Sequence, residues 1–262
     1  MRAELVRTWA FALRNLLMAS RNIFFLFELT FWPTVGVLSI GLMTRFLALA
    51  PDAAAYILIG TMALSTVQVC QLDVSYAVLY DVWSKSMKHQ FLAPIAIRHM
   101  TVGSWLVGVA RGVMVFVLLA TLAWWAFGFS PLAGGVAGLG VFLLGCFLTA
   151  WIVGVLVCAL VILFGTRAEA SAWATVNLVL VLAGIYYPVS LLPGPVAAIA
   201  SAIPLTYFLD AFRTYYGFAS EFTAPVTQGF LLSALYLLLG HWALGAAVRR
   251  TRRTGLLLKM SE

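Results

Sequence analysis

Hydrophobic residues run along this chain in long stretches, separated by short polar or proline-containing segments. A helix that crosses a bilayer needs about 20 mostly apolar residues, and six stretches reach that length. They cover residues 23–46, 54–80, 102–127, 136–164, 172–192 and 226–248. Their uniform hydrophobicity excludes the alternating pattern of transmembrane β-strands. The pattern therefore predicts an all-α integral membrane protein built as a six-span helical bundle.

Residues 1–21 carry a second pattern, in which arginines recur at every seventh position. Arg7, Arg14 and Arg21 fall on nearly one face of a helix. The apolar side chains between them are those of Leu5, Trp9, Leu13, Leu16 and Leu17. This arrangement predicts an amphipathic helix that lies in the headgroup plane before the first span. We expect no cleavable signal sequence, because the arginines are spread through the segment and no short apolar core with a cleavage site follows.

The segment before the last span is apolar but rich in proline. Its prolines are Pro188, Pro193, Pro195 and Pro204. One continuous helix is excluded, because proline removes a backbone hydrogen bond and clashes inside a helix. We expect two short helices, residues 193–203 and 205–216, which enter the outer leaflet and return. Tyr207 is one of several aromatic residues here that are typical of a membrane-interface belt. Residues 193–216 are thus a predicted re-entrant hairpin.

Composition and charge predict how the bundle is oriented. The chain is 63% hydrophobic and 10% charged, whereas soluble domains are about 45–50% apolar. Of its 16 lysines and arginines, only Arg45 and Arg213 fall on one side of the predicted spans, and Arg111 lies within a span. The others share the opposite side: Arg2, Arg7, Arg14, Arg21, Lys85, Lys88, Arg98, Arg167, Arg249, Arg250, Arg252, Arg253 and Lys259. The positive-inside rule then places both termini in the cytoplasm, in a bacterial-type inner membrane. This topology and anionic headgroups explain the net charge of +7, so no nucleic-acid partner is expected.

The segment DVWSKSMKHQFLAPIAIRH, residues 81–99, concentrates charge between the second and third spans. An apolar face is supplied by Val82, Met87, Phe91 and Leu92, and a polar and aromatic rim by Trp83, Lys85, Lys88 and His89. This composition fits either a docking helix or an ordinary basic inner loop. His89 and His99 share the segment, with Asp81 as the only acid near them in the sequence.

Polar residues within the predicted spans are functional suspects, because burying them in a bilayer is costly. The ionisable ones are Glu28, Asp73, Arg111 and His241. The second span also carries a polar stripe at three- and four-residue steps, formed by Ser65, Gln68, Gln71 and Ser75. This stripe, with Asp73 and Arg111, lines a translocation path near a dimer axis or makes interhelical hydrogen bonds. Helical geometry alone leaves open whether Arg111 pairs with Glu28 or with Asp73.

Catalytic chemistry finds little support in the sequence. Cys70, Cys146 and Cys158 lie far apart inside predicted spans, where we interpret them as small apolar fillers. We expect no metal site and no disulfide framework. No lysine follows a glycine, so the phosphate-binding Gly-x-x-x-x-Gly-Lys-Ser/Thr loop is missing. A membrane enzyme would need clustered catalytic side chains. A secondary transporter driven by an ion gradient often has paired discontinuous helices, and only one broken segment is seen here.

Two motifs give the chain a resemblance to a known family. One is FLAPIAI, residues 91–97, which follows the second span. The other is YYPVSLLPGPVAAIASAIPLTYFLDAFR, residues 186–213, which ends in Asp210 and Arg213. Together with the six spans and the N-terminal helix, they resemble the permease subunit of type-2 ABC transporters, in the exporter branch. Ile203 departs from the pattern, because the family often has Asn before Pro-Leu-Thr-Tyr.

The resemblance implies one type-2 transmembrane domain over residues 1–262, without catalytic residues. It implies that the segment 81–99 is a coupling helix seated on a separate ATPase. The coupling residues would be Asp81, Val82, Trp83, Lys85, Met87, Lys88, His89, Phe91, Leu92 and Pro94. It further implies a homodimer with two ATPase chains, which bind the ATP and Mg, and no cofactor in this chain. The cargo would be a lipid-linked glycan, a lipid or another amphiphile such as a drug, moved outward.

Overall fold

The protein is described by a computed structural model that covers residues 1–262 except 1, 22, 88–94 and 255–262. All regular elements of the described residues are helices. The long ones are α1 (Arg2–Ser20), α2 (Ile23–Phe46), α3 (Pro51–Trp83), α5 (Ile97–Phe127), α6 (Gly135–Phe164) and α10 (Pro225–Thr254). The shorter ones are η1 (Gly165–Ala168), α7 (Ser171–Leu182), η2 (Val189–Leu191), α8 (Gly194–Ala200), α9 (Pro204–Arg213) and η3 (Thr214–Tyr216). The all-α prediction is confirmed for this part of the chain.

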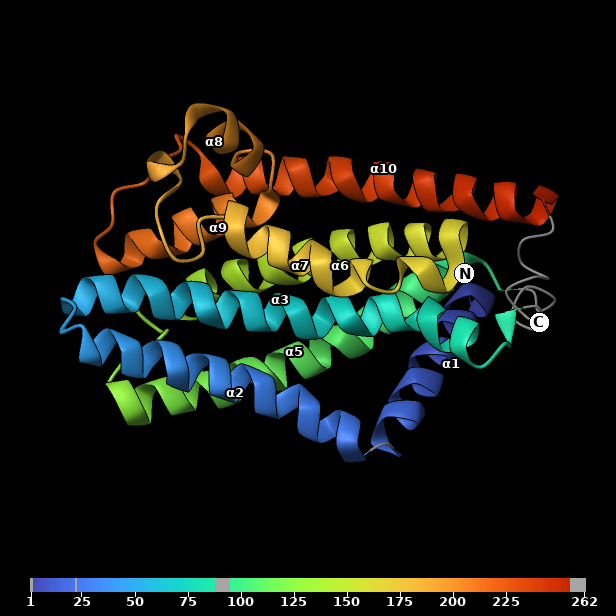
Figure 1. Ribbon diagram of the computed structural model, residues 1–262, viewed down its shortest axis with the longest axis horizontal. Coiled ribbons are helices and arrows are strands. Elements are labelled where there is room, and N and C mark those ends of the chain that lie inside the picture. Colours follow the sequence, from blue (N-terminus) through green and yellow to red (C-terminus); the bar gives the residue numbers. More distant parts are fainter. Residues whose placement is uncertain (1, 22, 88–94, 255–262) are drawn as a thin grey trace.

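Long helices lie side by side along the longest axis of the molecule (Figure 1). α3 lies in the middle, where it packs against α2, α5, α6 and α7. The start of α1 and the end of α10 lie at one end of the bundle, and α8 and α9 lie at the other (Figure 1). The positively charged ends of the sequence are therefore on the same side, as the charge pattern predicts.

Within the described part of the chain, four helices are long and apolar enough to cross a membrane: Pro51–Trp83, Ile97–Phe127, Gly135–Ala168 and Pro225–Thr254. A fifth crossing results only if the bent pair Gly194–Ala200 and Pro204–Tyr216 counts as one span. The predicted count of six is not confirmed. α2 has 24 residues but is not among the four, and it contains Pro33 and Arg45.

The predicted fifth span, residues 172–192, is wrong as a single helix. α7 has 12 residues, about 18 Å of helix, against a hydrocarbon core of about 30 Å. The chain leaves the helix at Ala183, and Gly184 then takes a left-handed φ of 67° that favours glycine. Pro188 next holds an extended conformation before η2. The apolar run continues past the helix, which is why hydrophobicity alone overestimated its length.

The two short helices predicted before the last span are confirmed as α8 and α9, which meet at 89°. Pro195 and Pro204 lie in their first turns, where proline costs no hydrogen bond. α9 buries Leu205, Phe208 and Leu209 in the bundle. The hairpin is therefore anchored by its second helix, while Ile199 of α8 remains exposed.

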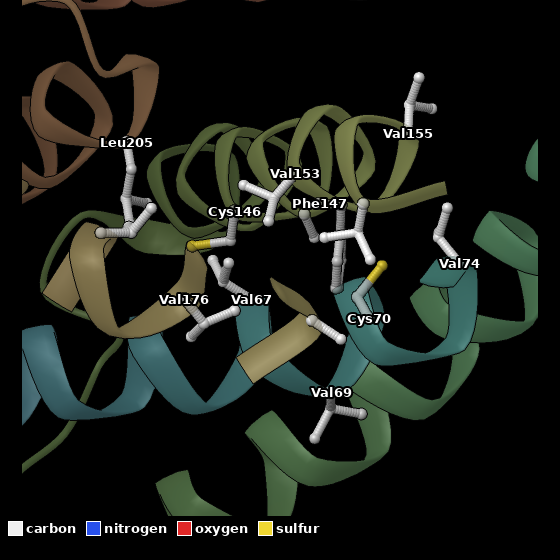
Figure 2. Close-up of a cluster of buried hydrophobic side chains, with 14 of the residues drawn as sticks. Val67, Val69, Cys70, Val74, Cys146, Phe147, Val153, Val155, Val176 and Leu205 are labelled. Carbon is white, nitrogen blue, oxygen red and sulfur yellow. The ribbon is translucent and has the colours of Figure 1, made fainter. Parts of the chain in front are cut away.

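Close packing between α3, α5 and α6 depends on small residues. A Cβ at Gly108 would lie 2.9 Å from the carbonyl oxygen of Cys70, and one at Gly112 would lie 2.6 Å from the Phe147 ring. The Gly-x-x-x-Gly pair of α5 thus faces both neighbouring helices at once. Figure 2 shows the adjoining core, in which Cys70 and Val74 of α3 approach Phe147 of α6. All three cysteines are free and buried, which confirms their interpretation as apolar fillers.

Candidate functional site

The segment between α3 and α5 is only partly described. Lys88, His89, Phe91, Leu92 and Pro94 lie outside the described residues. Of the other predicted coupling residues, Val82 and Met87 are buried inside the protein, whereas Trp83 and Lys85 are exposed. The Trp83 indole donates a hydrogen bond of 3.1 Å to Glu169, in the turn before α7. Trp83 and Lys85 are thus the predicted coupling residues that are exposed in the described part of this segment.

Asp81, at the end of α3, is fully buried and forms an ion pair with Arg14 of α1. The Ser86 hydroxyl donates to the same carboxylate at 3.0 Å, and the Ser86 amide donates to the Asp81 carbonyl at 2.9 Å. These bonds hold the turn after α3 in place. Asp81 thus ties the beginning of the segment to α1 instead of facing outward.

Glu4, near the start of α1, makes the matching connection at the other end of the segment. Its carboxylate accepts hydrogen bonds of 2.7 Å from His99 and 2.7 Å from Arg98, and it pairs with Arg7 at 3.0 Å. His99 Nδ1 accepts the Ala96 amide, so the ring proton lies on Nε2, which donates to Glu4. Bonds from His99 and then Arg98 lower the pKa of Glu4 from 4.5 to about 2.

α1 therefore holds the chain on both sides of the segment between α3 and α5. We call Glu4, Arg14, Asp81, Arg98 and His99 the α1 clamp. Sequence reasoning missed it, because Glu4 and His99 are 95 positions apart and neither has a local pairing signal. Asp81 is the only acid near His99 in the sequence, but the fold brings the Glu4 carboxylate to the His99 ring.

Within the bundle, Arg111 of α5 forms a buried ion pair with Asp73 of α3. Of the two predicted pairings, the one between Arg111 and Asp73 is therefore observed. The side chain of Glu28 lies outside the described part of the structure. An isolated charge inside a membrane protein is costly, and mutual pairing is the usual solution. The pair fastens α3 to α5 on the side where α1 joins them.

The polar stripe of α3 is partly satisfied within its own helix. Gln71 donates a hydrogen bond of 2.7 Å to the Ser75 hydroxyl, which in turn donates 3.0 Å to the Gln71 carbonyl. Ser65 is buried and Gln68 is half-buried. The structure therefore brings Gln71 and Ser75 of the stripe together within one helix.

Asp210 and Arg213, at the end of α9, bond to two different parts of the bundle end that contains α8 and α9. Buried Arg213 donates to the carbonyls of Gly184 and Ile185, each at 2.7 Å, and its guanidinium lies 3.4 Å from the Tyr56 ring centroid. It thereby provides hydrogen-bond partners for two carbonyls in the turn that follows α7. Asp210 instead accepts from the Ser220 hydroxyl at 2.6 Å, in the loop before α10.

The hairpin itself is closed by side-chain bonds to its turn. The Tyr207 hydroxyl donates 2.7 Å to the Ser201 carbonyl, and the Thr206 hydroxyl donates 2.9 Å to the Ala200 carbonyl. Glu221 adds a link to η2, because it accepts from the Ser190 hydroxyl at 2.9 Å. These hydrogen bonds hold together the segments at this end of the bundle. Among the described residues, no group of three His, Cys, Asp or Glu side chains is arranged to hold a metal ion.

Comparison with known proteins gives two similarities. The family described as ABC-2 type transporter matches residues 7–216. The match includes all the clamp residues except Glu4, together with the buried ion pair and the hairpin. An uncharacterized protein of Archaeoglobus fulgidus is 40% identical over 47 residues, which are 18% of this chain and 73% of that protein.

Proposed function

The chain belongs to the ABC-2 type transporter family, and from that premise we propose that it is the membrane-spanning permease subunit of an ATP-driven exporter. The family match supports this proposal over most of the chain, and the four long apolar helices fit a multi-pass membrane protein. In the proposed assembly, two copies of this permease join two copies of a separate ATPase. ATP and Mg bind the ATPase, and this chain contributes no catalytic residue or cofactor.

The observation that carries the coupling mechanism is the α1 clamp. The segment that joins α3 to α5 lies in the chain between Asp81 and Arg98, and both of these residues are ion-paired with α1. A force applied to the segment by a closing ATPase is therefore passed to α3, α5 and α1 together. The Asp73–Arg111 pair extends the same connection deeper, since it joins α3 to α5. These pairs make the three helices suited to move as one body.

We further propose six crossings with both termini in the cytoplasm. α2 supplies the first, and α7 with the chain up to residue 192 supplies the fifth, while residues 193–216 form a re-entrant hairpin in the outer leaflet. The bend of 89° and the anchoring of α9 in the core support the hairpin. The thirteen basic residues on one side support the orientation.

The cargo we propose is an amphiphile, namely a lipid-linked glycan, a lipid or a drug, taken from the cytoplasm or inner leaflet and released outside. Ser65, Gln68, Gln71 and Ser75, with Asp73 and Arg111, are the proposed path residues. Transport driven by an ion gradient is the second candidate, because a buried carboxylate such as Asp73 is the kind of group that relays protons. Loss of transport on adding a protonophore, with ATP still present, would favour that candidate.

The coupling role can be tested by substitution of the predicted docking residues. Phe91→Ala with Leu92→Ala removes two apolar side chains, each worth about 1.5–3 kcal/mol when buried at an interface. We expect co-purification of the ATPase with the tagged permease to fall at least about tenfold, at about 1.4 kcal/mol per decade. The matched control is Lys85→Gln with Lys88→Gln, which should change binding less, because rim charges contribute little to affinity. Unchanged ATPase binding by the Phe91 and Leu92 variant would refute the coupling assignment.

A further inference from the structure

A surface groove of about 430 Å³ lies between α1 and α5. Its walls are apolar and exposed: Trp9, Leu13 and Leu16 come from α1, and Leu106, Ala110 and Met114 come from α5. Among the described residues, Ser20 and Arg111 are the polar or charged ones that line it. An exposed apolar groove of this kind in a membrane protein is suited to an acyl chain.

The groove exists because α1 approaches α5 at one point and then diverges from it. At the close point, a Cβ on Gly103 would lie 2.7 Å from the Thr8 carbonyl oxygen. From there α1 leaves the bundle obliquely, towards the start of α2 (Figure 1). The space between the two helices is a wedge that the described side chains do not fill.

The charged side chains that line this groove and its neighbour, among the described residues, are all arginines. A second groove of about 450 Å³ lies on the other side of Leu13, and it is lined by Leu17 and Met18 together with Arg14 and Arg21. Among the described residues, no acidic side chain lines either groove. Arg14 is engaged by Asp81, whereas Arg21 is exposed at the end of α1.

We propose that the two grooves beside Leu13 form a binding site for an anionic phospholipid of the inner leaflet. One acyl chain lies in the α1–α5 groove, and the phosphate lies against Arg21. A lipid bound there fills the wedge and holds α1 at its angle to α5. This lipid site requires that the chain lies in a membrane with α1 and α5 arranged as described. It does not require that ATP, instead of an ion gradient, drives transport.

Trp9 makes the site measurable, because brominated acyl chains quench a nearby indole. The detergent-purified chain is titrated with phosphatidylglycerol or phosphatidylcholine that carries brominated chains, and the same titration with Trp9→Phe isolates the Trp9 signal. Ala110→Phe fills the groove, and Ala234→Phe is its matched control, because Ala234 is an exposed alanine of α10. Arg21→Gln tests the headgroup contact.

We expect saturable quenching of Trp9 by phosphatidylglycerol, which Ala110→Phe removes and Ala234→Phe leaves intact. Arg21→Gln should reduce the preference for phosphatidylglycerol about fivefold, which corresponds to about 1 kcal/mol for one basic residue near an anionic surface. Equal, unsaturable quenching by both lipids would overturn the site, and so would full quenching of Ala110→Phe. A change of oligomeric state in Ala110→Phe alone would also overturn it, since a second copy would then cover the groove.

Discussion

Two carboxylates hold the N-terminal helix to the rest of the protein, and they differ in environment. Asp81 is fully buried and pairs with Arg14, whose side chain is 27% exposed. Glu4 is 42% exposed and pairs with Arg98 and His99. The first pair should contribute to stability through burial. The second should respond to pH, because its carboxylate is accessible to water.

Removal of the Asp81 charge should destabilise the protein more than most surface changes. Breaking a fully buried pair costs about 3–5 kcal/mol, and we expect about 2–3 kcal/mol for Asp81→Asn, because Arg14 is partly exposed. The measurement is thermal unfolding of the purified chain in detergent, compared with Arg14→Gln and the double variant. If the effects of the two single variants simply add, the pair has no coupling energy and the clamp loses its main contact.

Glu4 should give the clamp an acid-sensitive component. Its folded pKa of about 2 lies below the ordinary value of 4.5, so its contribution is complete above about pH 4.5 and is lost as pH falls towards 2. We expect Glu4→Gln to lower the unfolding temperature at pH 7 and the difference from wild type to shrink between pH 4.5 and 2. A difference that stays constant over this window would contradict the assigned ion pairs.

At the scale of elements, local signals predicted the helices well and their ends less well. Pro193, Pro195 and Pro204 mark the broken hairpin in the sequence, because proline acts on its own helix. The end of α7 at Leu182 was missed, because the apolar run continues beyond it. Arg213, 29 positions beyond Gly184, bonds the carbonyls of the turn after α7, a contact that only folding creates. The partner of Arg111 likewise required the helices to be placed in space.

The hairpin can be located by cysteine labelling. Ala198 of α8 is exposed, so Ala198→Cys should react with a membrane-impermeant maleimide added outside intact cells. Arg252→Cys, near the end of α10, is the control and should react only after the membrane is opened. The three native cysteines are buried and leave a low background. Labelling of Ala198→Cys only from the cytoplasm would show that residues 193–216 cross the membrane.

At the scale of the molecule, the fold class and the family followed from the sequence, whereas the mechanical connections did not. Long apolar runs and the two motifs at residues 91–97 and 186–213 are continuous in the chain, so they can be read without a structure. The clamp and the lipid groove join α1 to segments some 70 to 95 positions away, and only folding brings these together. The amphipathic pattern of α1 gave no sign that this helix is bonded to both ends of the segment between α3 and α5.

ATP hydrolysis by this chain in lipid nanodiscs, measured with and without the ATPase that co-purifies with it, tests whether it is a permease powered by a partner. We expect no turnover by the chain alone, because its sequence has no phosphate-binding loop. We expect the complex to hydrolyse ATP at a rate different from that of the ATPase alone, and Phe91→Ala with Leu92→Ala to abolish the difference. ATP turnover by the isolated chain, or identical rates for the ATPase with and without it, would contradict this function.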